Sequence, residues 1–177
     1  MKKTVLTFGL ISGAMMIVMM AATMPFADKI GFDRMLIIGY TTMVAAFLMV
    51  FFGIRSYREN IGEGKISFGK AFAIGILITL ITCVCYVAAW EVIYFKFMPD
   101  FAEKYGQHLV EKAKAAGATQ QAIESKLQEM RQLKERLDNP FINAAMTFTE
   151  PFPVGLVITL ISSFILRKTG KKRDDQN

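Results

Sequence analysis

The stretch NPFINAAMTFTEPFPVGLVITLISSFIL, residues 139–166, decides how the rest of the chain is arranged. It has the length and apolar composition of a membrane-spanning helix, yet it carries one carboxylate, Glu150, followed by Pro151 and Pro153. Each proline lacks a backbone N–H and opens the hydrogen-bond ladder of a helix, so we predict a kink here. Because proline suits the first position of a helix, the span is predicted to cover residues 140–166.

Three earlier segments also have the composition of membrane spans. The chain is 53% hydrophobic and 20% charged, and its charges are confined to short segments between long apolar runs. This partition indicates a membrane protein rather than a soluble one. The predicted spans cover residues 4–24, 35–54 and 70–98, and together they form the region 1–98. A signal peptide is the rival interpretation of the first run, but its apolar core is usually only about 7–15 residues long.

A polar segment, residues 99–139, separates the third span from the last. Its apolar residues recur at helical spacing, Gly117 suits the C-terminal cap of one helix and Thr119 suits the N-terminal cap of the next. Acidic and basic side chains balance one another over residues 100–138. We therefore predict an all-α membrane protein with four transmembrane helices and an α-helical hairpin inserted between helices 3 and 4.

The distribution of Lys and Arg predicts the orientation. Basic residues gather at the N-terminus, in the link 55–70 and in the basic tail 167–177, whereas the first link carries only Lys29 and Arg34. Short loops rich in Lys and Arg remain in the cytoplasm, so both termini are predicted to be cytoplasmic and the hairpin extracytoplasmic. The net charge of +6 is explained by these flanks, and we expect no nucleic-acid partner. The expected location is the plasma (inner) membrane, as a multi-pass protein.

This layout resembles a known family. The features that carry the resemblance are a basic glycine-containing turn, a third span that ends in aromatic residues and Glu91, a helical hairpin, an Asn-Pro start to the last helix, and a serine-containing span that ends in Arg-Lys. Together they resemble the bacterial membrane family catalogued as domain of unknown function 4199. The resemblance covers nearly the whole chain and implies a four-span membrane protein, without an activity or a substrate.

The candidate polar site consists of Glu150, Glu91, Pro151, Pro153 and Lys96. Carbonyl groups freed by the prolines, next to a carboxylate, can hold a proton or a cation, as in the broken helices of transporters. Glu91 is expected near the outer boundary of the third span, where it could face Glu150 across the bundle with Lys96, His108 or Lys29 nearby. The alternative for Glu150 is that it reaches the membrane interface or caps a helix that starts at Pro151. The alternative for Glu91 is an ordinary interfacial residue among aromatic side chains.

Small residues form ridges on two of the spans. Close approach of helix backbones in a membrane depends on such residues, which lets us predict helix contacts along both ridges. The ridge residues are Gly9, Gly13, Gly155, Thr159 and Ser163. These contacts are either internal to the chain or between two copies.

Methionines gather in the outer half of the first span, and thioethers can bind Cu(I). No His or Cys stands at matching depth apart from Cys83 and Cys85, nearer the middle of the third span, and Met is also an ordinary gap-filling residue. We therefore expect no metal site and no cofactor. The methionines are Met15, Met16, Met19, Met20 and Met24.

We find no phosphate-binding loop, catalytic triad or metal-ligand cluster in the sequence, and the single histidine, His108, lies in the charged hairpin. The first hypothesis is a non-enzymatic scaffold or accessory protein in the lipid bilayer. Its hairpin, residues 100–138, would contact another membrane protein or a second copy of the chain. The alternative is a small transporter or proton- or cation-coupled protein that uses Glu150 and Glu91.

Overall fold

The computed structural model describes residues 1–168, apart from the side chain of Asp28, so most of the predicted basic tail lies outside the described residues. Within residues 1–168, the regular structure consists of helices and an isolated backbone bridge between Ile66 and Lys168. In this part of the chain, four helical segments are long and apolar enough to cross a membrane. The prediction of an all-α membrane architecture is confirmed.

The helices follow one another with a 3₁₀ turn, η1, after the first and a π-helical turn, η2, after the fourth. They are α1 (Lys2–Thr23), η1 (Met24–Phe26), α2 (Ala27–Ile30), α3 (Phe32–Asn60), α4 (Phe68–Val92), η2 (Ile93–Phe97), α5 (Phe101–Ala115), α6 (Gln120–Leu137), α7 (Pro140–Phe148) and α8 (Pro151–Leu166). Helix α3 extends beyond the predicted 35–54 at both ends, because the charged residues that flank the apolar run are also helix formers. The last predicted span consists of two helices, α7 and α8.

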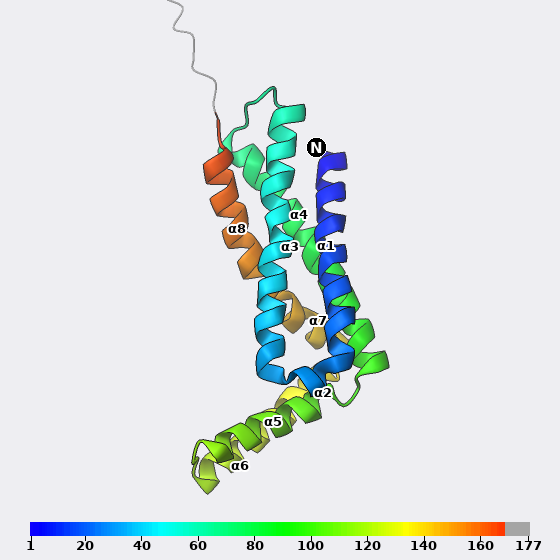
Figure 1. Cartoon of the computed structure of the whole chain (residues 1–177), viewed down its shortest axis with the longest axis vertical. Helices are drawn as coiled ribbons and strands as arrows, with labels where there is room; N and C mark the ends of the chain where they lie inside the picture. Colours follow the sequence, from blue (N-terminus) through cyan, green and yellow to red (C-terminus); the bar gives the residue numbers. More distant parts are fainter. Residues whose placement is uncertain (169–177) are drawn as a thin grey trace, which may run out of the picture.

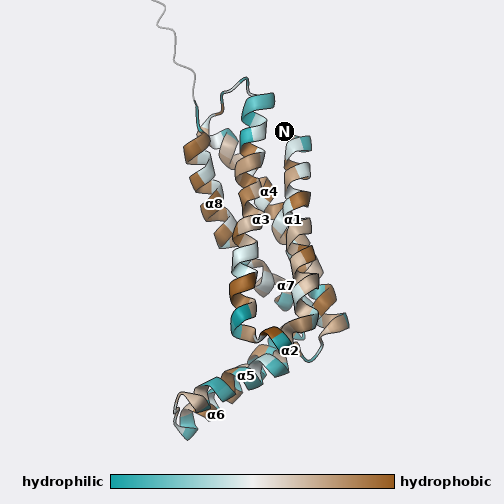
Figure 2. Ribbon diagram, viewed as in Figure 1, coloured by the Kyte–Doolittle hydropathy of each residue, from teal (hydrophilic) through white to brown (hydrophobic). Residues whose placement is uncertain are grey.

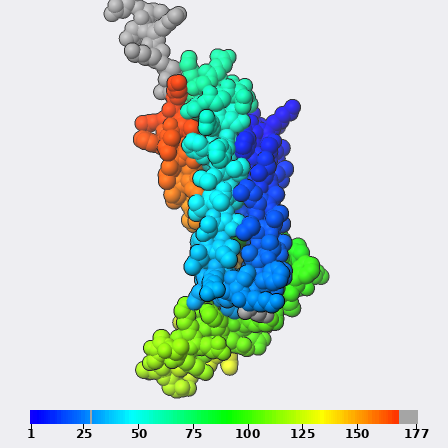
Figure 3. Space-filling model, in the orientation of Figure 1, coloured from blue at the N-terminus to red at the C-terminus, as the bar shows by residue number. Residues whose placement is uncertain are grey.

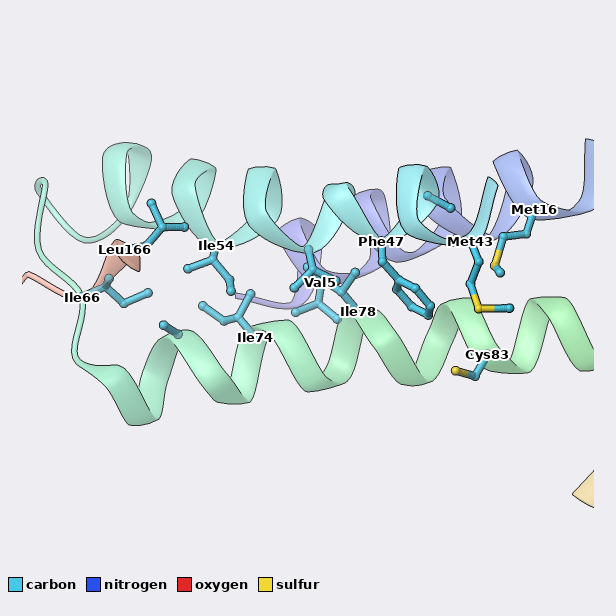
Figure 4. Packing of buried hydrophobic residues seen from close by; sticks show 13 residues of the cluster. Val5, Met16, Met43, Phe47, Ile54, Ile66, Ile74, Ile78, Cys83 and Leu166 are labelled. Carbon is cyan, nitrogen blue, oxygen red and sulfur yellow. The ribbon is translucent and has the colours of Figure 1, made fainter. Parts of the chain in front are cut away.

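The bundle is built around α3 and α4, with α1 packed on one side of this pair and α8 on the other (Figure 1). Apolar residues dominate the bundle, and hydrophilic residues gather near the N-terminus, the α3–α4 link and the α5–α6 end (Figure 2). The side chains of Phe47, Ile54, Ile74 and Ile78 are fully buried between the helices (Figure 4). Lipid tails are as apolar as these side chains, so close packing rather than exclusion of water must hold the helices together.

Small residues allow that close packing within one chain. A Cβ atom built on Gly13 of α1 would lie 2.6 Å from Cys85 Cβ of α4, and one on Gly9 would lie 2.9 Å from Ile81 Cβ. On the other side of the pair, Thr159 of α8 is fully buried and its hydroxyl lies 3.0 Å from that of Thr79.

Ser163 of α8 is also fully buried. Both small-residue ridges predicted from the sequence therefore face neighbouring helices of the same chain.

Helices α5 and α6 pack against one another and project from one end of the bundle (Figures 1 and 3). Gly117 adopts a positive φ of 77°, and Thr119 caps α6 by accepting a hydrogen bond from the Ala122 N–H at 3.3 Å, so both predicted caps are confirmed. The unit is anchored to the bundle by an ion pair, in which Lys112 Nζ lies 2.8 Å from Asp33 Oδ1 at the start of α3.

The close contacts of Gly155 in α8 support a prediction about stability. A Cβ atom on Gly155 would lie 2.7 Å from Phe47 Cε1 and closer still to Thr79 Cγ2, so Gly155→Ala overpacks the α3–α4–α8 junction. We expect a loss of about 1–3 kcal/mol in the free energy of unfolding, measured by thermal or denaturant unfolding in detergent micelles. Gly69→Ala is the control, because a Cβ atom there meets nothing within 4 Å. Equal stability of the two variants would contradict the proposed packing.

Candidate functional site

The last span is interrupted at Thr149 and Glu150, between α7 and α8. Pro151 and Pro153 begin α8 and supply no backbone N–H to the preceding turn. The chain compensates locally, because the Thr147 carbonyl, which an N–H at position 151 would have bonded, accepts the Glu150 N–H at 3.4 Å. The predicted kink is therefore a break, and it places the Glu150 carboxylate at the junction of two short helices.

An aromatic ladder along α4 and the following turn η2 holds this broken span in place. It consists of Tyr86, Trp90 and Tyr94, which are four residues apart and so share one face of the helix. The Tyr86 hydroxyl donates a hydrogen bond to Glu150 Oε2 at 3.0 Å. The Tyr94 hydroxyl donates to Asp138 Oδ1 at 3.3 Å. This spacing also suits an aromatic belt at the membrane interface, and in the fold the polar end of each side chain donates a hydrogen bond to another side chain of the protein.

Trp90, the middle residue of the ladder, contacts Asn143 of α7, which is fully buried. Its Oδ1 accepts hydrogen bonds from Trp90 Nε1 at 3.0 Å and from the Thr147 hydroxyl at 3.1 Å. Its Nδ2 donates to the Leu137 carbonyl at 2.9 Å, at the end of α6. One amide therefore joins α4, α6 and α7, and this fixes the direction from which the chain enters the last span.

Two cavities meet at Glu150. The first has a volume of about 70 Å³ and lies between α1 and α3, with Tyr86 and Glu150 in its wall. The second, of about 180 Å³, is lined by the same two residues together with Trp90, Leu137 and Thr147, among others. Glu150 is exposed rather than enclosed by side chains. Its carboxylate is accordingly accessible from both cavities, and a volume of 70 Å³ is large enough for about two water molecules.

The structure does not bring every predicted site residue to this place. Glu91 lies on α4 five residues after Tyr86, which turns it to another face of the helix, and it lines neither cavity. Its Oε1 is buried without a hydrogen-bond partner among the described residues. Lys96 is exposed on the π-helical turn η2 and also lines neither cavity. Glu150, with Pro151 and Pro153 beside it, is thus the centre of the candidate site.

Sequence reasoning missed the residues that complete the site. The sequence assigns neither Tyr86 nor Asn143 to it. A usable signal existed, because the polar ends of Tyr and Trp take a hydrogen-bond partner when the ring is buried. A stripe on one span therefore predicts polar residues on its neighbour. The methionines of α3, Met35 and Met43, were also missed, and both line the first cavity.

Other candidate groups lie apart from Glu150. Cys83 is buried and Cys85 is half-buried, and both are free thiols. His108 lies on α5, where its Nε2 is 3.7 Å from Asp33 Oδ1. Among the described residues, no group of three His, Cys, Asp or Glu side chains is arranged to hold a metal ion.

Four candidate spans, with a carboxylate at a break in the last of them, define the chain as a helical membrane protein with a polar site. The family described as "Protein of unknown function (DUF4199)" matches residues 7–168, and the chain belongs to this family. Comparison with curated proteins finds no match, and comparison with solved structures finds none either.

The role of Asn143 can be tested by Asn143→Leu, which has nearly the same volume but no polar atoms. It leaves the Trp90 N–H and the Leu137 carbonyl unpaired, and a buried group in that state costs about 1–3 kcal/mol. We expect a lower unfolding midpoint in detergent and a shifted emission maximum of Trp90, the only tryptophan in the chain. Ala145→Leu, on the exposed face of α7, is the matched control. Unchanged Trp90 emission in Asn143→Leu would rule out the ladder.

Proposed function

We propose that this membrane protein binds a proton or a small cation at Glu150 and passes it between the two cavities that the carboxylate lines. The observation that carries the proposal is the position of Glu150 at a helix break, accessible from both cavities. An isolated charge in the hydrocarbon region of a membrane costs several kcal/mol, so such a residue is usually protonated, paired or functional. Broken helices hold ions in the same way in known transporters.

The hydrogen bond from Tyr86 supports this role. It orients one oxygen of the Glu150 carboxylate, Oε2, toward the Tyr86 hydroxyl. A carboxylate held by one neutral donor keeps its charge available for a ligand, whereas a salt bridge would neutralise it. Because Tyr86 also lines both cavities, it is placed to pass a proton along with the carboxylate.

The arrangement of the ends supports the proposed orientation in the plasma membrane. The N-terminus, the α3–α4 link and the end of α8 lie at one end of the bundle, and α5 and α6 lie at the other (Figure 1). Lys168 pairs with Ile66 of the link. Basic flanks favour the cytoplasmic side, so we place the N-terminus and the end of α8 there and the α5–α6 hairpin outside. Helix α8 has 16 residues, which corresponds to about 24 Å and puts Glu150 nearer the outer face.

The second candidate function is that of a non-enzymatic scaffold or accessory protein. It is supported by a groove of about 300 Å³ along α5 and α6, the part that projects from the bundle. Leu127 in this groove is 40% exposed, beside Gly106, Met130 and Lys134. The groove combines apolar side chains with charged ones of both signs, Glu103 and Arg131 among them, and this suits an amphipathic helix of another membrane protein or of a second copy. Neither candidate involves an enzymatic step.

The ion-binding role predicts the outcome of a flux experiment. Purified protein in liposomes is given a proton or Na⁺ gradient, and flux is followed with an enclosed pH- or Na⁺-sensitive dye. We expect Glu150→Gln to reduce flux to the level of protein-free liposomes, because the amide keeps the shape but loses the charge. Glu135→Gln, on the exposed face of α6, is the control and should transport normally. Wild-type flux in Glu150→Gln would end the proposal.

The scaffold role predicts a different result. Leu127→Glu places a charge in the α5–α6 groove, so a membrane partner that copurifies with the wild-type chain should be lost. Gln132→Glu introduces the same charge at an exposed position of α6 and should leave the partner bound. Affinity purification from crosslinked membranes, followed by mass spectrometry, makes the comparison. An identical set of partners in both variants would count against this role.

A further inference from the structure

The first cavity beside Glu150 has an unusual lining. Half of the chain's 12 methionines surround this one space of about 70 Å³, and no other residue type contributes as many side chains to it. The methionines come from α1, η1 and α3, and Glu150 and Tyr86 complete the wall. They are Met16, Met19, Met20, Met24, Met35 and Met43.

The packing of α1 against α3 explains why these methionines meet. The buried Ser12 hydroxyl donates a hydrogen bond to the Ala46 carbonyl at 2.8 Å, which sets the register of the two antiparallel helices. One turn further along α1 is Met16, and the same step back along α3 reaches Met43 and its neighbour Thr42. Met16 and Met43 lie at the same end of the apolar cluster (Figure 4).

The same register continues toward the outer end of the bundle. Two turns beyond the Met16–Met43 pair, about 12 Å away along each helix, it brings Met24 opposite Met35. Between these two pairs, Met20 faces the part of α3 that contains Gly39. A Cβ atom on Gly39 would meet nothing within 4 Å, so the absence of a side chain there keeps the cavity open.

We infer that this cavity binds a soft monovalent cation, Cu(I), through thioether sulfurs, with the Glu150 carboxylate as its counter-charge. The inference rests on the proposed function and names the cation for the same site. Soft thioether ligands select Cu(I), whereas hard cations such as Na⁺ and Ca²⁺ prefer several oxygen ligands. One carboxylate balances one monovalent cation, so the occupied site is neutral and the cost of holding charge within the membrane falls.

Oxygen ligands are fewer than sulfur ligands in the lining of this cavity. Apart from Glu150, the lining side chains that contain oxygen are Tyr86, Thr23 and Thr42. The Tyr86 hydroxyl already donates to Glu150, and the Thr23 hydroxyl donates to the Met19 carbonyl at 2.8 Å. Sulfur is therefore the more abundant ligand.

The exposure of the methionine side chains differs between the two ends of the cavity. Met16 and Met43 are 3% and 2% exposed, whereas Met24 and Met35 at the outer end are half-buried. An ion that enters at the outer pair can thus be handed from thioether to thioether toward the sealed inner pair. From the sequence we expected no metal, because no His or Cys other than Cys83 and Cys85 stands at matching depth and Met is an ordinary gap-filling residue. The fold adds two methionines of a second helix, α3, and the Glu150 carboxylate.

The test is anaerobic titration of the purified full-length protein with Cu(I), in competition with the chromophoric chelator bicinchoninate. Ag(I), a redox-inert surrogate, is titrated in parallel. We expect a 1:1 complex, and the double variant Met16→Leu/Met43→Leu should bind on the order of tenfold more weakly or worse, since it removes thioethers at nearly constant volume. Met15→Leu/Met49→Leu changes two half-buried methionines outside the cavity and should bind like the wild type.

Gly39→Leu provides an independent test of the same site. It fills the cavity without removing a sulfur atom, so it should also abolish Cu(I) binding. Wild-type affinity in both Gly39→Leu and the inner double variant, or an equal loss in the Met15/Met49 control, overturns the inference. So does the absence of Cu(I) binding by the wild-type protein.

Glu150→Gln separates this inference from the proposed function. In one outcome, the flux of protons or Na⁺ depends on Glu150 but the protein does not bind Cu(I). This outcome leaves the proposed function intact and rules out the Cu(I) site. In the reverse outcome, Cu(I) binding depends on the methionines but not on Glu150, and no flux depends on Glu150. This outcome rules out both the proposed function and the role of Glu150 as counter-charge.

Discussion

The constraint on which the structure depends is the need to satisfy polar groups within the last membrane span. Pro151 and Pro153 remove backbone donors in a region where lipid offers no replacement. The Thr147 carbonyl accepts the Glu150 N–H instead, and the polar side chains Glu150 and Asn143 of this span, together with Asp138, accept hydrogen bonds from the aromatic ladder. Because this ladder joins α4 to α7 and to the end of α6, it also determines where the α5–α6 unit leaves the bundle.

Packing inside the bundle and chemistry at the end nearer α5 and α6 follow from different residues. Glycine and threonine bring α1 and α8 close to the central pair, where the side chains of Thr79 and Thr159 are fully buried. Nearer the end that carries α5 and α6, long and flexible methionine side chains replace the small residues and leave a space beside Glu150. A membrane protein can thus combine a rigid half with an adaptable half, since thioether chains repack easily.

Much of the fold and some of the site could be predicted. Spans, caps at Gly117 and Thr119, and the interruption near Glu150 all follow from local patterns, because length, hydropathy and proline chemistry act within a few residues of one another. The pairing of Glu150 with Tyr86 rather than with Glu91 could not be predicted. It depends on the rotation of α4 about its own axis, which is set by the glycine contacts of Gly9 and Gly13 across the bundle.

The sequence by itself determined that the chain enters a membrane, how often it crosses, and that one carboxylate stands among prolines in the last span. The reason is that lipid acts as a solvent on each segment separately. Only the tertiary structure decided what surrounds that carboxylate. Met35 and Met43 are far from Glu150 along the chain, and they share a cavity with it because the register of α1 on α3, marked by the Ser12–Ala46 hydrogen bond, aligns them.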